Sequence, residues 1–281
     1  MLIRAKLLEI ELLEAQLLGA EFMEESPVAF SRKFLWELRE ACLCFLKEAL
    51  KNHPENVMCL RLLPVLLFMS FPCSASVSAT VTLASDYLFN GVSQTDENPA
   101  LQASLDWTGD NGVYAGVWAS NVDFGEGTDV EFDGYIGYFT ALTEKVNLDV
   151  GIAQYSYHGQ SSSENFNYPE AWIKFNSGNT HLNYWYSWDY FGTGAGHSII
   201  MLSHTIPVNE RWSVDLGLDR SFSHDEAQWA WEPGKTHYTH AKVSGTYSLR
   251  HWLLTLGYEW TDLETFGDST LVFTIQRTFN F

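Results

Sequence analysis

Several histidines lie beside serines and acids, the residue types that nucleophilic catalysis combines. Ser198 follows His197, and His224 is followed directly by Asp225. A serine nucleophile needs a histidine base that is itself oriented by an acid or an amide. The chain, however, contains no G-x-S-x-G elbow or other recognised nucleophile motif. These proximities therefore do not predict an enzyme.

The histidine spacing does not predict a metal site either. His237 and His240 would point to opposite faces of a strand, and no histidine pair has the H-E-x-x-H spacing of a zinc protease. The acidic loops at 123–127 and 159–164 do not match the spacing of a calcium loop. We therefore expect no metal and no other cofactor.

Acidic residues recur on one face of short segments in which polar and apolar residues alternate. Asp149, for example, lies between Leu148 and Val150. Alternation of this kind indicates strands, whose successive side chains point to opposite faces. The polar faces carry Asp86, Asp106, Glu131, Asp133, Asp149, Glu170, Asp215, Asp219 and Glu259, opposed clearly only by Lys174 and Lys242.

Twelve such segments account for the chain after residue 79. They span residues 80–90, 100–107, 112–122, 129–140, 146–157, 168–176, 180–190, 197–206, 211–222, 236–248, 251–262 and 270–281. Short and long connections alternate, which is typical of outer-membrane barrels, and twelve strands of about ten residues fit this length. We predict an all-β fold: a 12-stranded antiparallel transmembrane β-barrel over residues 80–281.

A soluble, exported β-sandwich would show the same alternation, but three features favour the membrane. Residues 80–281 contain no cysteine, although small exported domains often use disulfides. Aromatic residues gather near strand ends, as in the girdles of transmembrane barrels. The chain ends on Phe279 and Phe281, which is similar to the terminal signal that outer-membrane proteins present to the barrel-assembly machinery. Arg277 on the same face would extend toward the membrane interface.

The composition changes sharply near residue 80. All four cysteines lie before it, and most of the net charge of -19 lies after it. From Met58 the chain resembles a secretory signal peptide, in which Arg61 is followed by an apolar stretch over 62–71. Val77 and Ala79 then provide the small residues that signal peptidase reads. We predict a signal peptide at 58–79 that is cleaved after Ala79.

Residues 1–57 read as two amphipathic helices, which gives the chain an α-helical N-terminal extension. One interpretation is a cytoplasmic helical hairpin joined to an internal signal anchor. The other is that translation starts at Met58 and that 1–57 is a mis-assigned start. We favour the second, because an export signal behind 57 residues would be hard to use.

Composition excludes several classes of protein. The strongly negative net charge argues against a nucleic-acid binder, which carries a basic patch, and an aromatic content of 15% argues against a disordered chain. No apolar run reaches the roughly 18 residues of a membrane-spanning helix. Helical transporters and helical channels are therefore excluded.

A family resemblance rests on the start of the barrel region. Residues 85–95 read SDYLFNGVSQT, residues 98–102 read NPALQ, and residues 114–122 read YAGVWASNV. This resembles the TorF-type porin family (Gcw_chp) of proteobacterial outer-membrane proteins, over all of 80–281. Asn90 stands where the family has Arg. The resemblance implies a porin-like barrel in the outer membrane of a Gram-negative bacterium.

The acidic faces predict the function. If the apolar faces contact lipid, the acids line a lumen, and acidic pores favour cations. We predict an outer-membrane porin-like channel for passive diffusion of small solutes, cation-preferring or neutral. Its partners would be outer-membrane lipid and lipopolysaccharide, the barrel-assembly machinery and small solutes, after export through the inner membrane. An outer-membrane lipid hydrolase and a structural or adhesive barrel are the alternatives.

Overall fold

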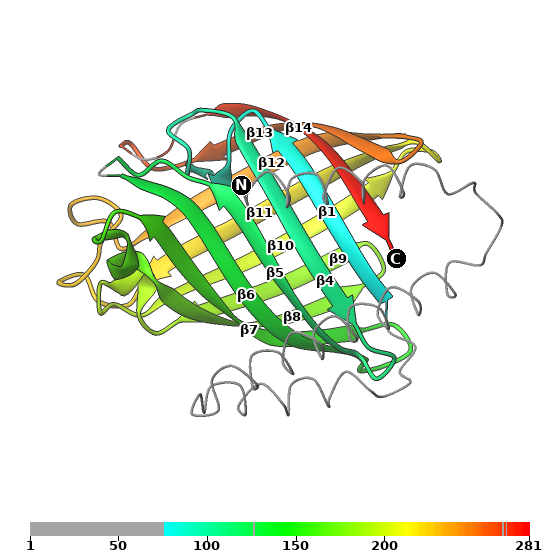
Figure 1. The fold of residues 1–281 in the computed structure, drawn as a ribbon, viewed down its shortest axis with the longest axis horizontal. Coiled ribbons are helices and arrows are strands. Elements are labelled where there is room, and N and C mark those ends of the chain that lie inside the picture. The colour runs from blue at the N-terminus through cyan, green and yellow to red at the C-terminus, as the bar shows by residue number, and fades with distance from the viewer. Residues whose placement is uncertain (1–75, 126, 266, 268) are drawn as a thin grey trace, which may run out of the picture. The chain divides into compact units, whose positions relative to one another are not determined.

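The alternating segments form one closed antiparallel barrel of twelve strands (Figure 1). The structure, a computed structural model, describes residues 76–281 except 126, 266 and 268. The barrel strands are β1 (Ser76–Ala84), β4 (Ala100–Thr108), β5 (Val113–Asn121), β6 (Thr128–Ala141), β7 (Asn147–Gly159), β8 (Tyr168–Ser177), β9 (Thr180–Ser187), β10 (His197–Pro207), β11 (Trp212–Ser223), β12 (His237–Leu249), β13 (Trp252–Thr261) and β14 (Thr270–Asn280). The predicted all-β, 12-stranded antiparallel barrel is confirmed.

The connections differ in length at the two ends of the barrel. At one end, here called the turn end, they have two to five residues. At the other, the loop end, they are longer and carry the hairpin β2 (Leu88–Phe89) and β3 (Val92–Ser93) and two short 3-10 helices, η1 (Ser163–Phe166) and η2 (Tyr190–Gly192). β1 starts and β14 finishes at the turn end (Figure 1). In the part of the chain that the structure describes, no helix has the length and apolar character needed to cross a membrane.

The first strand lies earlier in the sequence than predicted. β1 begins at Ser76, and its first residues pair on both sides: Ser78 lies opposite Asn280 of β14, and Val77 lies opposite Trp107 of β4. The predicted strand at 80–90 is therefore wrong at both ends. The strand starts four residues earlier, at Ser76, and the chain leaves the barrel wall after Ala84. The helical extension and most of the predicted signal segment lie outside the described residues, so cleavage after Ala79 stays a prediction.

The outer face of the barrel is a band of exposed apolar side chains. The mid-strand leucines Leu105, Leu202, Leu218 and Leu256 are each more than half exposed. Large aromatic side chains lie exposed near both ends of the strands, including Trp107, Trp188, Trp212, Trp252 and Trp260. An apolar band flanked by aromatic girdles is the surface that a transmembrane barrel presents to lipid.

Arg277 is a charged residue within this outer face. Its guanidinium lies 5.4 Å from the ring centroid of Trp252, its register partner, and 4.6 Å from that of Phe279. A guanidinium held over aromatic faces is stabilised by the ring quadrupoles. Two aromatic residues near the turn end thus accommodate the one charge that interrupts the apolar pattern of β14.

Candidate functional site

The predicted acidic residues lie on the inner face of the barrel. Along β6, buried Glu131 and Asp133 alternate with exposed Val130 and Phe132, and the other strands show the same alternation. The inner-face acids of the strands are Asp106, Glu131, Asp133, Asp149, Glu170, Asp215, Asp219 and Glu259, and the same face carries Lys174 and Lys242. Asp86 follows β1 and belongs to the segment that leads into the loop-end hairpin.

Neutral donors hold the acids in the turn-end half of the lumen. Asp149 accepts hydrogen bonds from the Tyr114 hydroxyl at 2.6 Å and from the Trp172 indole N–H at 2.9 Å. Asp106 accepts from the hydroxyls of Ser104 and Tyr135. Such donors stabilise a carboxylate without cancelling its charge. These carboxylates therefore add negative charge to this half of the lumen, where Lys174, opposite Asp149, is an opposing charge.

Asp215 follows the same pattern on the opposite wall. It accepts a hydrogen bond from the Thr205 hydroxyl at 2.5 Å and a longer one from the Thr246 hydroxyl at 3.5 Å. Both donors are uncharged, so this acid also leaves its charge in the lumen.

His240 compensates two of the acids near the loop end. Its Nδ1 lies 2.6 Å from Asp219 Oδ2 and its Nε2 lies 3.0 Å from Glu259 Oε2, so one imidazole bridges β11 and β13. His240 and Asp219 are both buried. The sequence predicted correctly that His237 and His240 face opposite ways, but it did not identify His240 as an ion-pairing residue.

Three acids on the other wall have no such partner. Glu131 and Asp133 of β6 and Glu170 of β8 are all buried. The Tyr157 hydroxyl donates to Glu131 Oε1 and the Tyr155 hydroxyl donates to Glu170 Oε1, each at 3.0 Å. Glu131 Oε2, Asp133 Oδ1 and Glu170 Oε2 are enclosed and accept no hydrogen bond among the described residues. These three residues are called the acid cluster below.

The inner-face lysines do not ion-pair with the acid cluster. The Lys174 ammonium lies 4.9 Å from the ring centroid of Trp172 and 5.5 Å from that of Trp185. Its charge acts on Glu170 and Asp149 only from beyond ion-pair distance. The stem of Lys242 lies across Gly217, where a Cβ would fall 2.8 Å from Lys242 Cγ. Both lysines are therefore held by packing against the wall.

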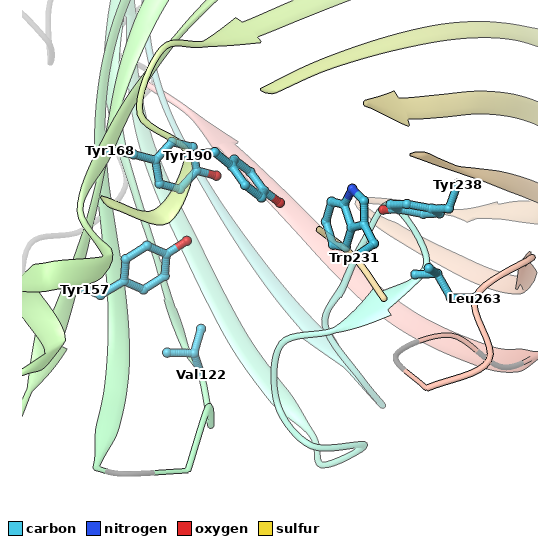
Figure 2. Packing of buried hydrophobic residues seen from close by; sticks show 7 residues of the cluster. All are labelled: Val122, Tyr157, Tyr168, Tyr190, Trp231, Tyr238 and Leu263. Carbon is cyan, nitrogen blue, oxygen red and sulfur yellow. The ribbon is translucent and has the colours of Figure 1, made fainter. Parts of the chain in front are cut away.

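A mainly aromatic cluster lies across the loop end of the barrel. Its buried members are Val122, Tyr157, Tyr168, Tyr190, Trp231, Tyr238 and Leu263 (Figure 2). Ring contacts run from Tyr157 of β7 through Phe191 and Tyr190 to Trp231 and Tyr238 of β12, with centroid distances of 5.4, 4.8, 5.8 and 4.6 Å. An unbroken series of rings thus crosses the lumen between strands on opposite sides.

The segment 85–95, called the crossing segment below, spans the rest of this opening. At one side the Tyr87 ring contacts Trp118 of β5 at 5.4 Å. At the other, the Tyr238 hydroxyl of β12 donates to the Asn90 carbonyl at 3.1 Å. Gly91, with φ of +80°, leaves no room for a side chain, since a Cβ would lie 2.5 Å from Thr261 Cγ2 and 2.7 Å from His240 Cδ2.

Hydrogen bonds to Asp86 hold the conformation of the crossing segment. Its Oδ1 accepts hydrogen bonds from Ser93 Oγ at 2.7 Å and from Thr95 Oγ1 at 2.9 Å. Ser93 Oγ in turn accepts from the backbone N–H of Glu97 at 2.9 Å. The first of the three stretches through which the sequence resembles a known family therefore builds this segment.

The candidate catalytic residues do not contact their sequence neighbours as the sequence suggested. Ser198 Oγ lies 2.9 Å from His224 Nε2, on the outer face near the loop end, whereas neighbouring His197 points inward and stacks on Tyr190 at 3.9 Å. Asp225 does not orient His224, because its carboxylate accepts from the backbone N–H of Ala227. In the described residues no acid or amide side chain bonds to the other imidazole nitrogen of His224. The structure brings together a serine and a histidine but no third group.

The predicted processing and assembly residues lie near the turn end. Val77 and Ala79 belong to β1, and Ala79 pairs with Phe279 of β14. Phe279 and Phe281 are both exposed.

A family model matches residues 72–279, which include every barrel strand except the last residue of β14. The chain belongs to the Gcw_chp family, described as bacterial proteins of unknown function. The match confirms the family that the crossing segment indicated. Comparison with curated proteins finds no match for this Gcw_chp chain.

Solved structures similar to this Gcw_chp barrel include outer-membrane proteins. A KdgM porin aligns at 8% identity and a TM-score of 0.46, covering 73% of this chain and 99% of that one. A NanC porin aligns at 10% identity and 0.45, covering 73% and 98%. The COG4313 outer membrane channel from Pseudomonas putida F1 aligns at 10% and 0.44, covering 75% and 97%. Likeness at this level assigns no solute to the chain.

Proposed function

We propose that the protein is an outer-membrane, porin-like channel for small solutes, with a preference for cations or neutral molecules. The observation that carries the proposal is the contrast between the two faces of the barrel. The exterior is apolar and aromatic, while the inner strand faces carry eight acids against Lys174 and Lys242. A polar, acidic lumen inside an apolar wall favours hydrated cations over anions.

Conduction would depend on the loop end. The aromatic cluster and the crossing segment narrow the opening there, so we expect solutes to pass more readily when these groups move. Loops near lumen openings are the parts of a barrel best able to move, because they lie outside the strand ladder. We expect brief openings of small conductance.

Reversal potentials in planar lipid bilayers test the proposal. The protein is refolded in lipid and studied across a salt gradient. We expect a reversal potential on the cation side, which shrinks when Asp106 and Asp215 are replaced by Asn. Anion preference would overturn the predicted selectivity, and the absence of any conductance from correctly folded protein would overturn the channel itself.

The proposed location and partners have their own support. The apolar band fits outer-membrane lipid, and the exposed loop-end segments would face lipopolysaccharide. The terminal Phe279 and Phe281 would be read by the barrel-assembly machinery. Fractionation of the native host, with heat-dependent migration on gels as the folding test, checks this location.

A lipid hydrolase remains a second candidate because of one contact. Ser198 Oγ and His224 Nε2 lie 2.9 Å apart near the loop end, although Ser198 is only 4% exposed. The dyad lacks an orienting group, which a serine nucleophile ordinarily requires. A phospholipase assay with and without calcium tests it. Activity that disappears in Ser198→Ala would replace the channel proposal, and no activity is the expected result.

A further inference from the structure

Two groups of acids lie a few residues inside the loop-end termini of their strands, and they differ in their partners. On one wall, Asp219 and Glu259 share His240, which touches both at hydrogen-bond distance. On the other wall, the described residues place no cation within ion-pair distance of Glu131, Asp133 or Glu170. The first group carries its own counter-charge, and the acid cluster does not.

The unpartnered atoms of the acid cluster specify what is missing. Glu131 Oε2, Asp133 Oδ1 and Glu170 Oε2 are all acceptors, and each is enclosed. Asp133 is only 6% exposed. A buried carboxylate without a partner is costly, and the cost is offset when a cation or several donors reach it. A ligand with positive charge and N–H donors would satisfy these acceptors.

The walls around the acids are phenol rings. Tyr157 and Tyr155 donate to Glu131 and Glu170, and Tyr155 stacks on Tyr168 at a centroid distance of 4.6 Å. Sites that bind organic ammonium groups commonly combine aromatic faces with carboxylates, because the ring quadrupoles attract the cation. Neutral donors orient two of the carboxyl groups here.

Tyr87 covers the cluster from the crossing segment. Partial burial, together with the nearby charges of Glu131 and Asp133, holds the pKa of the Tyr87 phenol well above its usual value. This ring therefore stays a neutral phenol beside the acids at any physiological pH. Because Tyr87 belongs to the segment that crosses the lumen, displacement of that segment would open the acids to solutes from the loop side.

The spacing of the acids favours an extended ligand. Glu131 and Asp133 are alternate residues of β6, so their backbones lie about 7 Å apart. Glu170 lies two strands away on β8, about 10 Å across the wall. Separations of this size match a flexible molecule that carries several amino groups along a chain.

We propose that Glu131, Asp133 and Glu170, with Tyr87, Tyr155 and Tyr157, form a binding site for an organic polycation with several N–H donors, of the polyamine class. This inference deepens the proposed channel function, because it names the class of solute that the lumen would select. It predicts saturable binding at equilibrium, whether or not the barrel conducts.

Calorimetry with folded full-length barrel and spermidine tests the site. We expect saturable binding, and a drop in affinity of at least about tenfold in the triple variant Glu131→Gln, Asp133→Asn, Glu170→Gln. The matched control is Asp129→Asn, which removes an exposed charge from the same end of β6 and should leave affinity within about twofold. Tetramethylammonium, which has charge but no N–H donor, should bind far more weakly than spermidine.

Three results would overturn the site. The first is that the native protein shows no saturable spermidine binding. The second is that Asp129→Asn and the triple variant lose spermidine affinity equally. The third is that tetramethylammonium binds as tightly as spermidine. If the triple variant does not fold, Glu170→Gln alone must weaken binding while heat-dependent gel migration stays native. The binding site and the channel can fail separately. A protein that binds spermidine but conducts no ions would support the site and reject the channel. A cation-selective pore that does not bind spermidine would support the channel and reject the site.

Discussion

At the residue scale, the lumen handles its negative charge in three ways. Neutral donors hold Asp106, Asp149 and Asp215, His240 compensates Asp219 and Glu259, and the acid cluster keeps atoms without partners. Each arrangement has a different energetic consequence. A charge held by neutral donors remains available to solutes, while a paired charge mainly supports the fold.

Replacing His240 by Ala should destabilise the barrel. Asp219 and Glu259 would lose their shared partner, and removing one member of a buried ion pair typically costs about 3–5 kcal/mol of unfolding free energy. Urea unfolding in lipid vesicles measures this, with His251→Ala, in an exposed turn, as the control. A triple variant that also carries Asp219→Asn and Glu259→Gln should regain much of the loss. Equal stability of the two single variants would show that the bridge contributes nothing.

At the element scale, the crossing segment is the feature that departs from a plain up-and-down barrel. Asp86 folds it, Tyr87 anchors it at β5, and Asn90 anchors it at β12. Alternation predicted a strand through residue 90, because Tyr87 and Phe89 continue the apolar pattern of β1. The side chains instead pack inside the loop end against other rings, which sequence periodicity cannot distinguish from packing against lipid.

Gly91 offers a direct test of this segment as a gate. Gly91→Val should displace the hairpin, because its Cβ would collide with Thr261 and His240, and the mean conductance of the pore should rise. Gly234→Ala is the control, since Gly234 has a similar φ of +75° but no atom within 4 Å of a new Cβ. Single-channel recordings compare the two. Unchanged conductance in folded Gly91→Val protein would reject the segment as the gate.

The ladder of β1 makes a prediction about processing. Ser76 to Ala79 pair with β4, and removing them would leave Leu105 to Thr108 without partners on that side. Unpaired backbone groups in a membrane wall cost several kcal/mol each, so we expect the mature chain to retain Ser76. Intact-mass spectrometry of the native protein measures the N-terminus. A mature chain that begins at Thr80 would instead support cleavage after Ala79, as the sequence alone predicts.

At the scale of the whole molecule, the chemistry of the outer surface determines whether the barrel is stable in water or in lipid. Its exposed leucines form a continuous band between two groups of aromatic side chains. Water would drive such a surface to aggregate, whereas lipid accommodates it without cost.

A charge at the middle of this band distinguishes lipid from water. Leu202→Arg, at the centre of β10, should lower the unfolding free energy by about 2–4 kcal/mol in vesicles, whereas Ile206→Arg near the turn end should cost about 1 kcal/mol or less. Denaturant titrations of both variants give the difference. Equal, small effects at the two positions would mean that lipid does not surround the barrel.

The sequence alone determined the barrel, its strand number and the inward direction of its acids. Period-two alternation reports which face a side chain occupies, and that information is local. The family also followed from local sequence, through residues 85–95, 98–102 and 114–122. Sequence did not determine that His240 bridges two acids, or that Ser198 meets His224 rather than its neighbour His197. Nor did it reveal that rings from opposite walls meet across the loop end. These contacts depend on which strands become neighbours and on how long loops fold inward, and both are fixed only when the barrel closes.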